Sequence, residues 1–203
     1  MIICVFGDST AWGAWDLEKG GWVNRLWLFF AKNQDQYDVD VHNLGVSFGG
    51  TSKGLLRRFK VEAEAREPDI IIFQGGGNDS AYVNREGNHR VTPKEYEKNL
   101  LKLIKLARKF TNKIIFLGFK NIDERKTMPV PWDKSIYYTD ENIKRYNDIQ
   151  KRICQKNKIE SIDIFGLLAM QDLADGLHPN SCGHEKIYKR VKSFLINNLD
   201  LSI

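Results

Sequence analysis

The chain opens with IICVFGDST, residues 2–10, an apolar run that stops at a Gly-Asp-Ser turn. The run lacks the polar alternation of a half-exposed strand, which is typical of a strand buried on both faces. Four more short apolar runs follow. Three of them also lack alternation of polar and apolar residues, and the exception is the run at residues 39–43. With the opening run they predict five strands, at residues 2–6, 39–43, 69–74, 113–118 and 161–164.

Longer segments with helical periodicity separate and follow these runs, at residues 21–33, 52–66, 93–110, 140–157 and 181–198. Cap-forming residues mark the start of three of them, at Thr92 with Pro93 behind it, at Thr139 or Asp140, and at Asn180 or Ser181. Strands alternating with helices predict βαβ units, whose right-handed crossovers place helices on both faces of a parallel sheet. We therefore predict an α/β fold, with one three-layer α/β/α domain over residues 1–203 built on a five-stranded parallel sheet.

Composition and charge favour an ordinary globular protein. Of the 203 residues, 42% are hydrophobic and 28% are charged, which argues against disorder. The formal net charge of +5 is spread along the chain. Its densest stretch, residues 102–113, alternates basic with apolar residues, as the solvent-facing side of an amphipathic helix does. Because no nucleic-acid motif accompanies the charge, we expect no nucleic-acid partner.

The cysteines and the N-terminus favour a cytoplasmic protein. Cys4, Cys154 and Cys182 are far apart, odd in number and form no CxxC pair, so a disulfide framework is not expected. The N-terminus lacks a basic segment, and its apolar run is too short for a signal peptide. No segment approaches the ~20 apolar residues of a membrane span, so we expect no stable membrane insertion.

Two short clusters carry candidate catalytic groups. Ser9 follows the first predicted strand, where its hydroxyl would lie at the sheet edge and its N–H would be unpaired. Asp175-Gly176-Leu177-His178 lies between the last predicted strand and the last helix. That spacing lets the Asp175 carboxylate bond one ring nitrogen of His178, fixing the tautomer and stabilising the imidazolium. Taken singly, a Gly-Asp-Ser turn is a common N-cap and a lone His is more often structural, which is how we interpret His184.

Two glycine-rich loops supply candidate oxyanion donors. Residues 74–80, QGGGNDS, follow the third predicted strand, and residues 43–52, NLGVSFGGTS, follow the second. Glycines let the backbone approach a ligand closely. In the functional interpretation, the Asn78 amide and a backbone N–H of the second loop donate to one oxyanion. In the alternative, both are flexible turns, and the second leads into a helix capped by Thr51 or Ser52.

The four clusters are more specific together than singly. A nucleophile, a base with its orienting carboxylate, and oxyanion donors are the parts that acyl transfer requires, and all fall at one end of the predicted sheet. A metal site made of Asp175 and His178 has no convincing third ligand, so we expect no metal and no cofactor.

Two long connections, residues 80–92 and 119–139, follow strand ends on the side where open α/β sheets bind ligands. The second is rich in proline and aromatic residues, namely Pro129, Pro131, Trp132, Tyr137 and Tyr138. It is either a substrate-facing lid or a packed surface loop.

The chain resembles the SGNH hydrolases, also called GDSL lipases or acylhydrolases. Four family blocks are matched in order across nearly the whole chain, at residues 7–9, 43–52, 76–79 and 175–178. The resemblance implies a flavodoxin-like α/β/α sandwich. It also implies Ser9 as nucleophile, His178 as general base and Asp175 as its partner. The implied oxyanion donors are the Ser9 N–H, a glycine N–H of the second block and the Asn78 side chain.

The chain differs from the usual family pattern at two places, and one further stretch of it also resembles the family. Thr10 stands where the family usually has Leu or Ile, at a position that mainly packs. In the second block, aligning Gly-Gly-Thr-Ser selects Gly49, whereas counting from Asn43 selects Gly45; we favour Gly49. Residues 12–23, WGAWDLEKGGWV, also resemble bacterial members of the family, and we attach no substrate to them.

The resulting prediction is a serine esterase that cleaves short acyl esters, acetyl among them, of small or sugar-like alcohols through an acyl-Ser9 intermediate. The loop aromatics can stack on a sugar or serve as core. The alternatives are a lysophospholipase- or thioesterase-type lipolytic enzyme, a non-catalytic family member that binds carbohydrate, and a flavodoxin-like ligand-binding domain. The last lacks GxGxxG and GxxxxGK[ST] motifs and leaves the Asp-x-x-His turn unexplained. The expected partner is a small-molecule ester.

Overall fold

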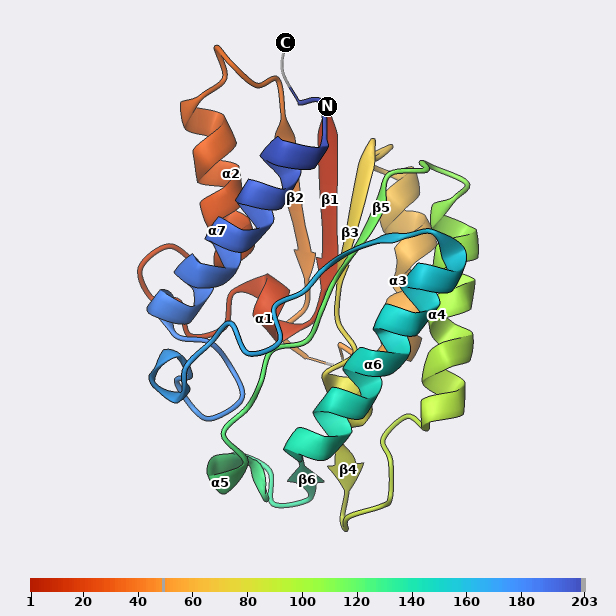
Figure 1. Ribbon diagram of the computed structural model, residues 1–203, viewed down its shortest axis with the longest axis vertical. Coiled ribbons are helices and arrows are strands. Elements are labelled where there is room, and N and C mark those ends of the chain that lie inside the picture. Colours follow the sequence, from red (N-terminus) through yellow and green to blue (C-terminus); the bar gives the residue numbers. More distant parts are fainter. Residues whose placement is uncertain (49, 202–203) are drawn as a thin grey trace.

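A computed structural model describes residues 1–48 and 50–201. Its centre is a five-stranded parallel sheet with the strand order β2-β1-β3-β5-β7 (Figure 1). Counting only these strands, the order is 2-1-3-4-5, that of flavodoxin-like folds. The predicted fold class is therefore confirmed, and every predicted strand is present with slightly shifted ends, as β1 (Ile2–Gly7), β2 (Asp40–Gly45), β3 (Ile70–Gln74), β5 (Ile114–Leu117) and β7 (Glu160–Ile162).

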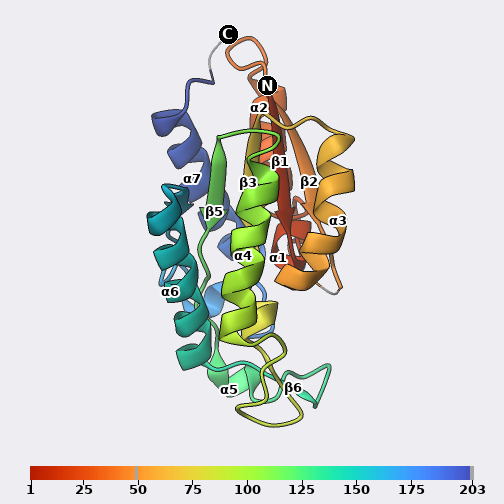
Figure 2. The same cartoon turned by 90° about the vertical axis from the view of Figure 1, so that its right-hand side faces the viewer.

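The sheet is covered on both faces, which explains its uninterrupted apolar runs. Successive side chains of a strand point to opposite faces. In β1, Ile3 and Val5 pack on one side, with α2 (Trp22–Lys32) and α7 (Ser181–Asn198). Cys4 and Phe6 pack on the other side, covered by α3 (Ser52–Glu64), α4 (Pro93–Ala107) and α6 (Asp140–Asn157). Figure 1 shows α2 beside α7 on one flank, and Figure 2 shows α4 between α3 and α6 on the other.

The helix starts follow the cap-forming residues of the sequence. The side chains of Thr92, Thr139 and Asn180 accept the backbone N–H three residues further on, and Thr51 does the same for α3. Each bond satisfies one of the unpaired N–H groups of a first helical turn. The helices predicted to reach residues 66 and 110 end earlier, at Glu64 and Ala107, because turns follow there.

A second, smaller sheet joins the two long connections. Strands β4 (Tyr82–Val83) and β6 (Ile136–Tyr137) pair antiparallel, and they lie beyond the carboxyl ends of the main strands, at the bottom of Figure 1. The sequence pattern does not predict these strands, since two residues are too few to show a period. The same holds for two single-turn helices, α1 (Ser9–Trp12) and α5 (Glu124–Thr127).

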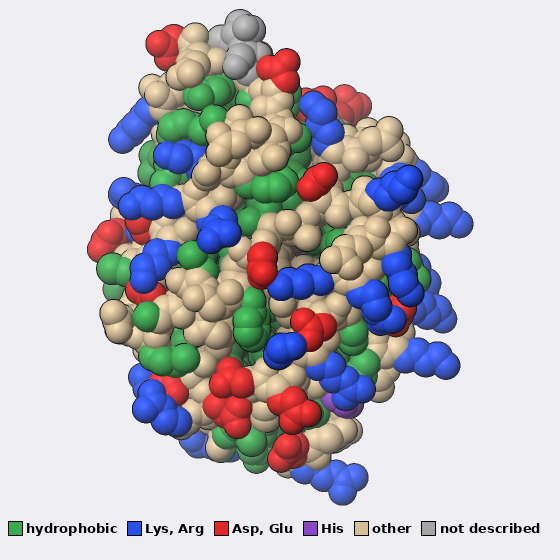
Figure 3. Space-filling view, in the orientation of Figure 1, with side chains coloured by type: hydrophobic (Ala, Val, Ile, Leu, Met, Phe, Trp, Pro, Cys, Tyr) green, Lys and Arg blue, Asp and Glu red, His purple; other side chains and the backbone are tan. Residues whose placement is uncertain are grey.

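The surface carries mixed charge on the face seen in Figure 3, where Lys and Arg side chains are interspersed with Asp and Glu. Several of the Lys and Arg side chains project from the side of the molecule on which α4 lies. Within the described residues, no helix has both the length and the apolar character needed to cross a bilayer. The three cysteines are free thiols, buried at Cys4 and Cys154 and exposed at Cys182.

Phe59 tests the packing of α3 on the sheet. Its ring is fully buried, with centroids 4.9 Å from Phe6 and 5.4 Å from Phe73. We expect Phe59→Ala to lower the free energy of unfolding by about 3–5 kcal/mol, because removing a buried ring leaves a cavity. Val61→Ala is the matched control on the same helix, since Val61 is 70% exposed. Urea denaturation measures both variants, and equal losses would contradict this packing.

Candidate active site

Ser9 stands at the junction of β1 and α1. Asp8 caps this single-turn helix, with its Oδ1 accepting the Thr10 N–H at 2.9 Å and the Gln74 Nε2 at 3.2 Å. A Cβ at Gly7 would lie 2.5 Å from the Gln74 carbonyl oxygen, so only glycine allows the chain to turn this close to β3. Among the residues that the structure describes, no acceptor engages the Ser9 N–H.

The structure brings Ser9, His178 and Asp175 into one hydrogen-bonded chain. Ser9 Oγ lies 2.9 Å from His178 Nε2, and His178 Nδ1 lies 2.7 Å from Asp175 Oδ2. Asp175 Oδ1 also accepts the backbone N–H groups of Leu177 and His178, at 2.9 and 2.7 Å. Since an ionised carboxylate only accepts, Nδ1 carries a proton toward Asp175, and the neutral ring leaves Nε2 free to accept the Ser9 hydroxyl.

The Asp175 carboxylate is held ionised. Burial by itself would raise its pKa, but the hydrogen bond and charge of His178, with the backbone N–H groups of the turn, outweigh burial and lower the pKa to about 2. A charged carboxylate at this place can stabilise the positive charge that forms on the ring when a proton is taken from Ser9. The neighbouring Lys120 adds positive charge toward Asp175 and Asp8, while burial lowers the pKa of Lys120.

Asn78 faces the same site from the end of β3. Its Oδ1 accepts the Tyr138 hydroxyl at 2.9 Å, and its Nδ2 donates to the Gly50 carbonyl at 3.3 Å. Because Tyr138 occupies the amide oxygen, the NH₂ group is turned toward the loop of residues 43–52. Asn78 and Ser9 line the same cleft, and the second N–H of the Asn78 amide, beside the one that bonds Gly50, can donate to an oxyanion formed there.

Asp79, the residue after Asn78, joins the two glycine-rich loops. It is fully buried and accepts hydrogen bonds from both the backbone N–H and the hydroxyl of Ser52, the first residue of α3. Ser52 Oγ in turn accepts Asn99 Nδ2 at 2.9 Å. Burial raises the pKa of Asp79 to about 7, against the lowering effect of Ser52. Asp79 thereby holds the Asn78 turn against the start of α3.

Gly49, the favoured donor of the second block, lies outside the described residues. Gly45, the alternative, ends β2 and donates its N–H to Asn43 Oδ1 at 3.0 Å. A Cβ at Gly45 would lie 2.2 Å from the backbone nitrogen of Trp12, so this glycine serves a close backbone approach. Gly50 is equally confined, because a Cβ there would lie 2.5 Å from the Cβ of Asp8.

An open cleft of about 150 Å³ leads to Ser9 and His178. The long connections form much of its wall, and residues 119–139 contribute groups that line this cleft. The Trp132 ring lies 5.5 Å from the His178 ring between centroids, and 54% of Trp132 is exposed. The other lining residues are Ser47, Phe48, Asn78, Arg90, Asp133, Ile136, Tyr138 and Leu177.

Sequence reasoning missed several of these groups. Trp132 and Tyr138 stood out only as aromatic residues of a long loop, and Arg90 and Asp133 resemble ordinary surface charges. His184 is buried, with Nε2 2.9 Å from the Ala14 carbonyl, as its structural interpretation predicts. Within residues 1–48 and 50–201, no group of three His, Cys, Asp or Glu side chains is placed to hold a metal ion.

Residues 5–186 match the GDSL-like lipase/acylhydrolase family. Esterase TesA of Pseudomonas aeruginosa is 25% identical over 94% of this chain and 86% of its own length. A lipase/acylhydrolase from Enterococcus faecalis has the same fold, with a TM-score of 0.78 at 20% identity, covering 98% of this chain and 97% of that chain. An acetylxylan esterase from Geobacillus stearothermophilus has a TM-score of 0.72 at 21% identity, covering 98% and 95%.

The family match spans most of the chain, and the strand order agrees with it. The chain therefore belongs to the GDSL-like lipase/acylhydrolase family, the SGNH hydrolases. It is accordingly a carboxylic ester hydrolase.

Tyr138 tests the orientation of the Asn78 amide. We expect Tyr138→Phe to lower kcat about tenfold with little change in KM, because loss of the hydroxyl frees the amide to rotate and weakens a donor that acts on the transition state. Tyr137→Phe is the matched control, since the adjacent Tyr137 lies on β6. Steady-state kinetics on p-nitrophenyl acetate measure both variants. Equal kcat values for Tyr138→Phe and the parent would remove Tyr138 from this role.

Proposed function

We propose that this chain is a serine esterase that cleaves short acyl esters of small, polyhydroxylated alcohols through an acyl-Ser9 intermediate. One observation carries the proposal, namely the continuous hydrogen-bonded chain from Ser9 Oγ through His178 to Asp175, at 2.9 and 2.7 Å. Asn78 lines the same cleft as Ser9 and His178, and its amide group has a second N–H beside the one that bonds Gly50.

The proposed first step is attack of Ser9 Oγ on the ester carbonyl carbon. His178 Nε2 takes the hydroxyl proton as the new C–O bond forms, and Asp175 stabilises the resulting imidazolium. The carbonyl oxygen becomes an oxyanion, held by the Ser9 N–H, the Asn78 Nδ2 and a backbone N–H of the second block, for which we propose Gly49. Each such donor is worth on the order of a hundredfold in rate.

Collapse of this intermediate breaks the bond to the alcohol oxygen, and His178 returns the proton to that oxygen as it leaves. Water then enters, loses a proton to His178 Nε2 and attacks the acyl carbon. The second intermediate expels Ser9 Oγ, which regains its proton, and the carboxylic acid departs.

The size of the cleft supports a short acyl group. Its volume of about 150 Å³ is below the roughly 300–1,000 Å³ of pockets for drug-sized ligands. The apolar cavity behind the glycine-rich loops, between α3, α4 and the sheet, measures only about 20 Å³ and has no room for a fatty acyl tail. A long-chain lipolytic function is therefore less well supported.

The walls of the cleft support a polyhydroxylated alcohol. The exposed Trp132 offers an aromatic face beside His178, on which the C–H face of a sugar ring can pack. Arg90 and Asp133 line the same cleft and offer a donor and an acceptor for hydroxyl groups. The similar acetylxylan esterase structure indicates that this fold accommodates an acetyl ester of a sugar.

Labelling with a fluorophosphonate tests the nucleophile. We expect the probe to modify Ser9, because His178 activates this hydroxyl toward an electrophilic phosphorus. Peptide mass spectrometry should find the adduct on the peptide that contains Ser9 and no adduct in His178→Ala. An adduct on another serine of active enzyme would overturn the assignment.

A chain-length series tests the acyl group. We expect kcat/KM to be highest for p-nitrophenyl acetate or butyrate and not to rise toward the octanoate, because methylenes that the cleft cannot bury gain none of the ~0.8 kcal/mol that burial of each would contribute. Saturation kinetics at substrate concentrations below micelle formation measure the series. A maximum at octanoate would favour the lipolytic alternative.

A further inference from the structure

The segment between α1 and α2 contains an exposed tryptophan that touches the triad. Trp15 Nε1 donates to Asp175 Oδ2 at 2.8 Å, although the two residues are 160 positions apart. The same oxygen receives His178 Nδ1 at 2.7 Å. We infer that Trp15 is a positioning residue that sets the geometry and basicity of the Asp175–His178 pair. This inference rests on the proposed serine-esterase function.

Trp15 differs from the other donors to Asp175. The remaining three hydrogen bonds come from the Leu177 and His178 backbone and from the His178 ring, all within the same short turn. Among the described residues, Trp15 is the donor that reaches Asp175 from the segment following Ser9. The indole therefore connects the loop that carries the base directly to the chain that carries the nucleophile, six residues after it.

The backbone holds Trp15 in an unfavourable conformation. Its φ angle is 66°, in the left-handed region that bulky side chains rarely adopt. Such a conformation persists only where the surroundings impose it, and it is enriched at functional sites. Trp15 itself is 54% exposed, so burial of the ring does not account for it.

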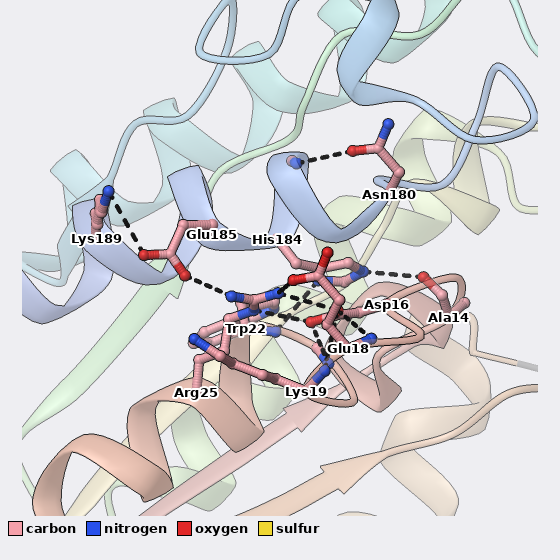
Figure 4. Close-up of polar contacts among 12 residues, drawn as sticks. Ala14, Asp16, Glu18, Lys19, Trp22, Arg25, Asn180, His184, Glu185 and Lys189 are labelled. Carbon is pink, nitrogen blue, oxygen red and sulfur yellow. Dashed lines mark hydrogen bonds and ion pairs between the residues drawn. The ribbon is translucent and has the colours of Figure 1, made fainter.

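Buried polar groups hold the two neighbours of Trp15 in the chain, Ala14 and Asp16 (Figure 4). On one side, the Ala14 carbonyl accepts a hydrogen bond from His184 Nε2 at 2.9 Å, and the backbone N–H of Trp22 donates to His184 Nδ1 at 3.2 Å. These two bonds define a neutral ring. Burial lowers the pKa of His184 to about 4, so the neutral form is kept at neutral pH.

On the other side, Asp16 forms a two-pronged ion pair with Arg25. Arg25 Nε and Nη2 donate to its two carboxylate oxygens, at 2.8 and 3.0 Å, and Gly21 N–H adds a bond of 2.9 Å. Arg25 Nη1 continues to Glu185 Oε2 at 2.5 Å. The side chains of Asp16 and Arg25 are 0% and 4% exposed. His184 and Glu185 both lie in the first turns of α7, and α7 follows the Asp175–His178 turn. The same helix therefore fixes both the segment of Trp15, which donates the hydrogen bond, and the turn of Asp175, which accepts it.

Two consequences for catalysis follow. Without the indole N–H, the charge on Asp175 Oδ2 is less compensated, so the Asp175–His178 pair holds its proton more tightly. The carboxylate also loses its link to the Ser9 segment, so the imidazole is less well aligned with Ser9 Oγ. Trp15 itself does not line the substrate cleft.

Trp15→Phe tests the inference by removing the N–H and keeping an aromatic ring. We expect kcat on p-nitrophenyl acetate to fall about tenfold, as for the loss of one hydrogen bond to a charged group. The rate is divided by the concentration of active sites, which is measured by titration with a fluorophosphonate. KM should stay within about twofold, and the acid limb of the kcat/KM profile should move to higher pH. Trp15→Leu should repeat the shift. The matched control is Trp12→Phe, with Trp12 52% exposed in α1.

A double-mutant cycle with Asp175→Asn distinguishes action through the carboxylate from a purely structural role of Trp15. It compares the loss of kcat caused by Trp15→Phe in the parent and in the Asp175→Asn variant. If Trp15 acts through the carboxylate, Trp15→Phe should cost less than about twofold in the Asp175→Asn background. Undiminished loss in that background, or an unshifted acid limb in Trp15→Phe, would overturn the inference. Failure of the proposed function has a different signature, because the parent enzyme would then show no labelling of Ser9.

Discussion

Parallel pairing at the centre of the sheet is the constraint on which the site depends. Gly7, at the end of β1, pairs with Gly45 of β2 on one side and with Gln74 of β3 on the other. The three strands therefore end level, and the loops that follow them begin at one edge. This register places Ser9, the second-block loop and Asn78 around one space, without any of the loops having to cross the sheet.

Buried polar groups then convert flexible glycine-rich loops into a defined geometry. Asp79 holds the Asn78 turn to α3 through Ser52. Arg25 joins Asp16, in the Trp15 segment, to Glu185 of α7. Burying such charges is unfavourable unless they are fully hydrogen-bonded, and removing one partner from such a pair is strongly destabilising. These hydrogen bonds thus favour a single arrangement of the loops.

The outer wall of the site has a different origin. The two long connections pair through β4 and β6, and this pairing delivers Tyr138 to the Asn78 amide and Trp132 to the His178 ring. The inner edge of the site thus follows from the common fold, whereas the outer wall of the cleft follows from these two connections.

Local sequence was sufficient for the fold class and for the central candidates. Apolar runs without alternation located the buried strands, because burial on both faces leaves no polar position. Ser9 and the Asp175–His178 pair were also found locally, since each lies in a short motif next to a strand or helix end. The contacts of Trp15 with Asp175 and of Tyr138 with Asn78 were decided only by the tertiary structure. They join side chains 160 and 60 positions apart, and whether such groups meet depends on loop paths and side-chain directions that no periodicity in the sequence records.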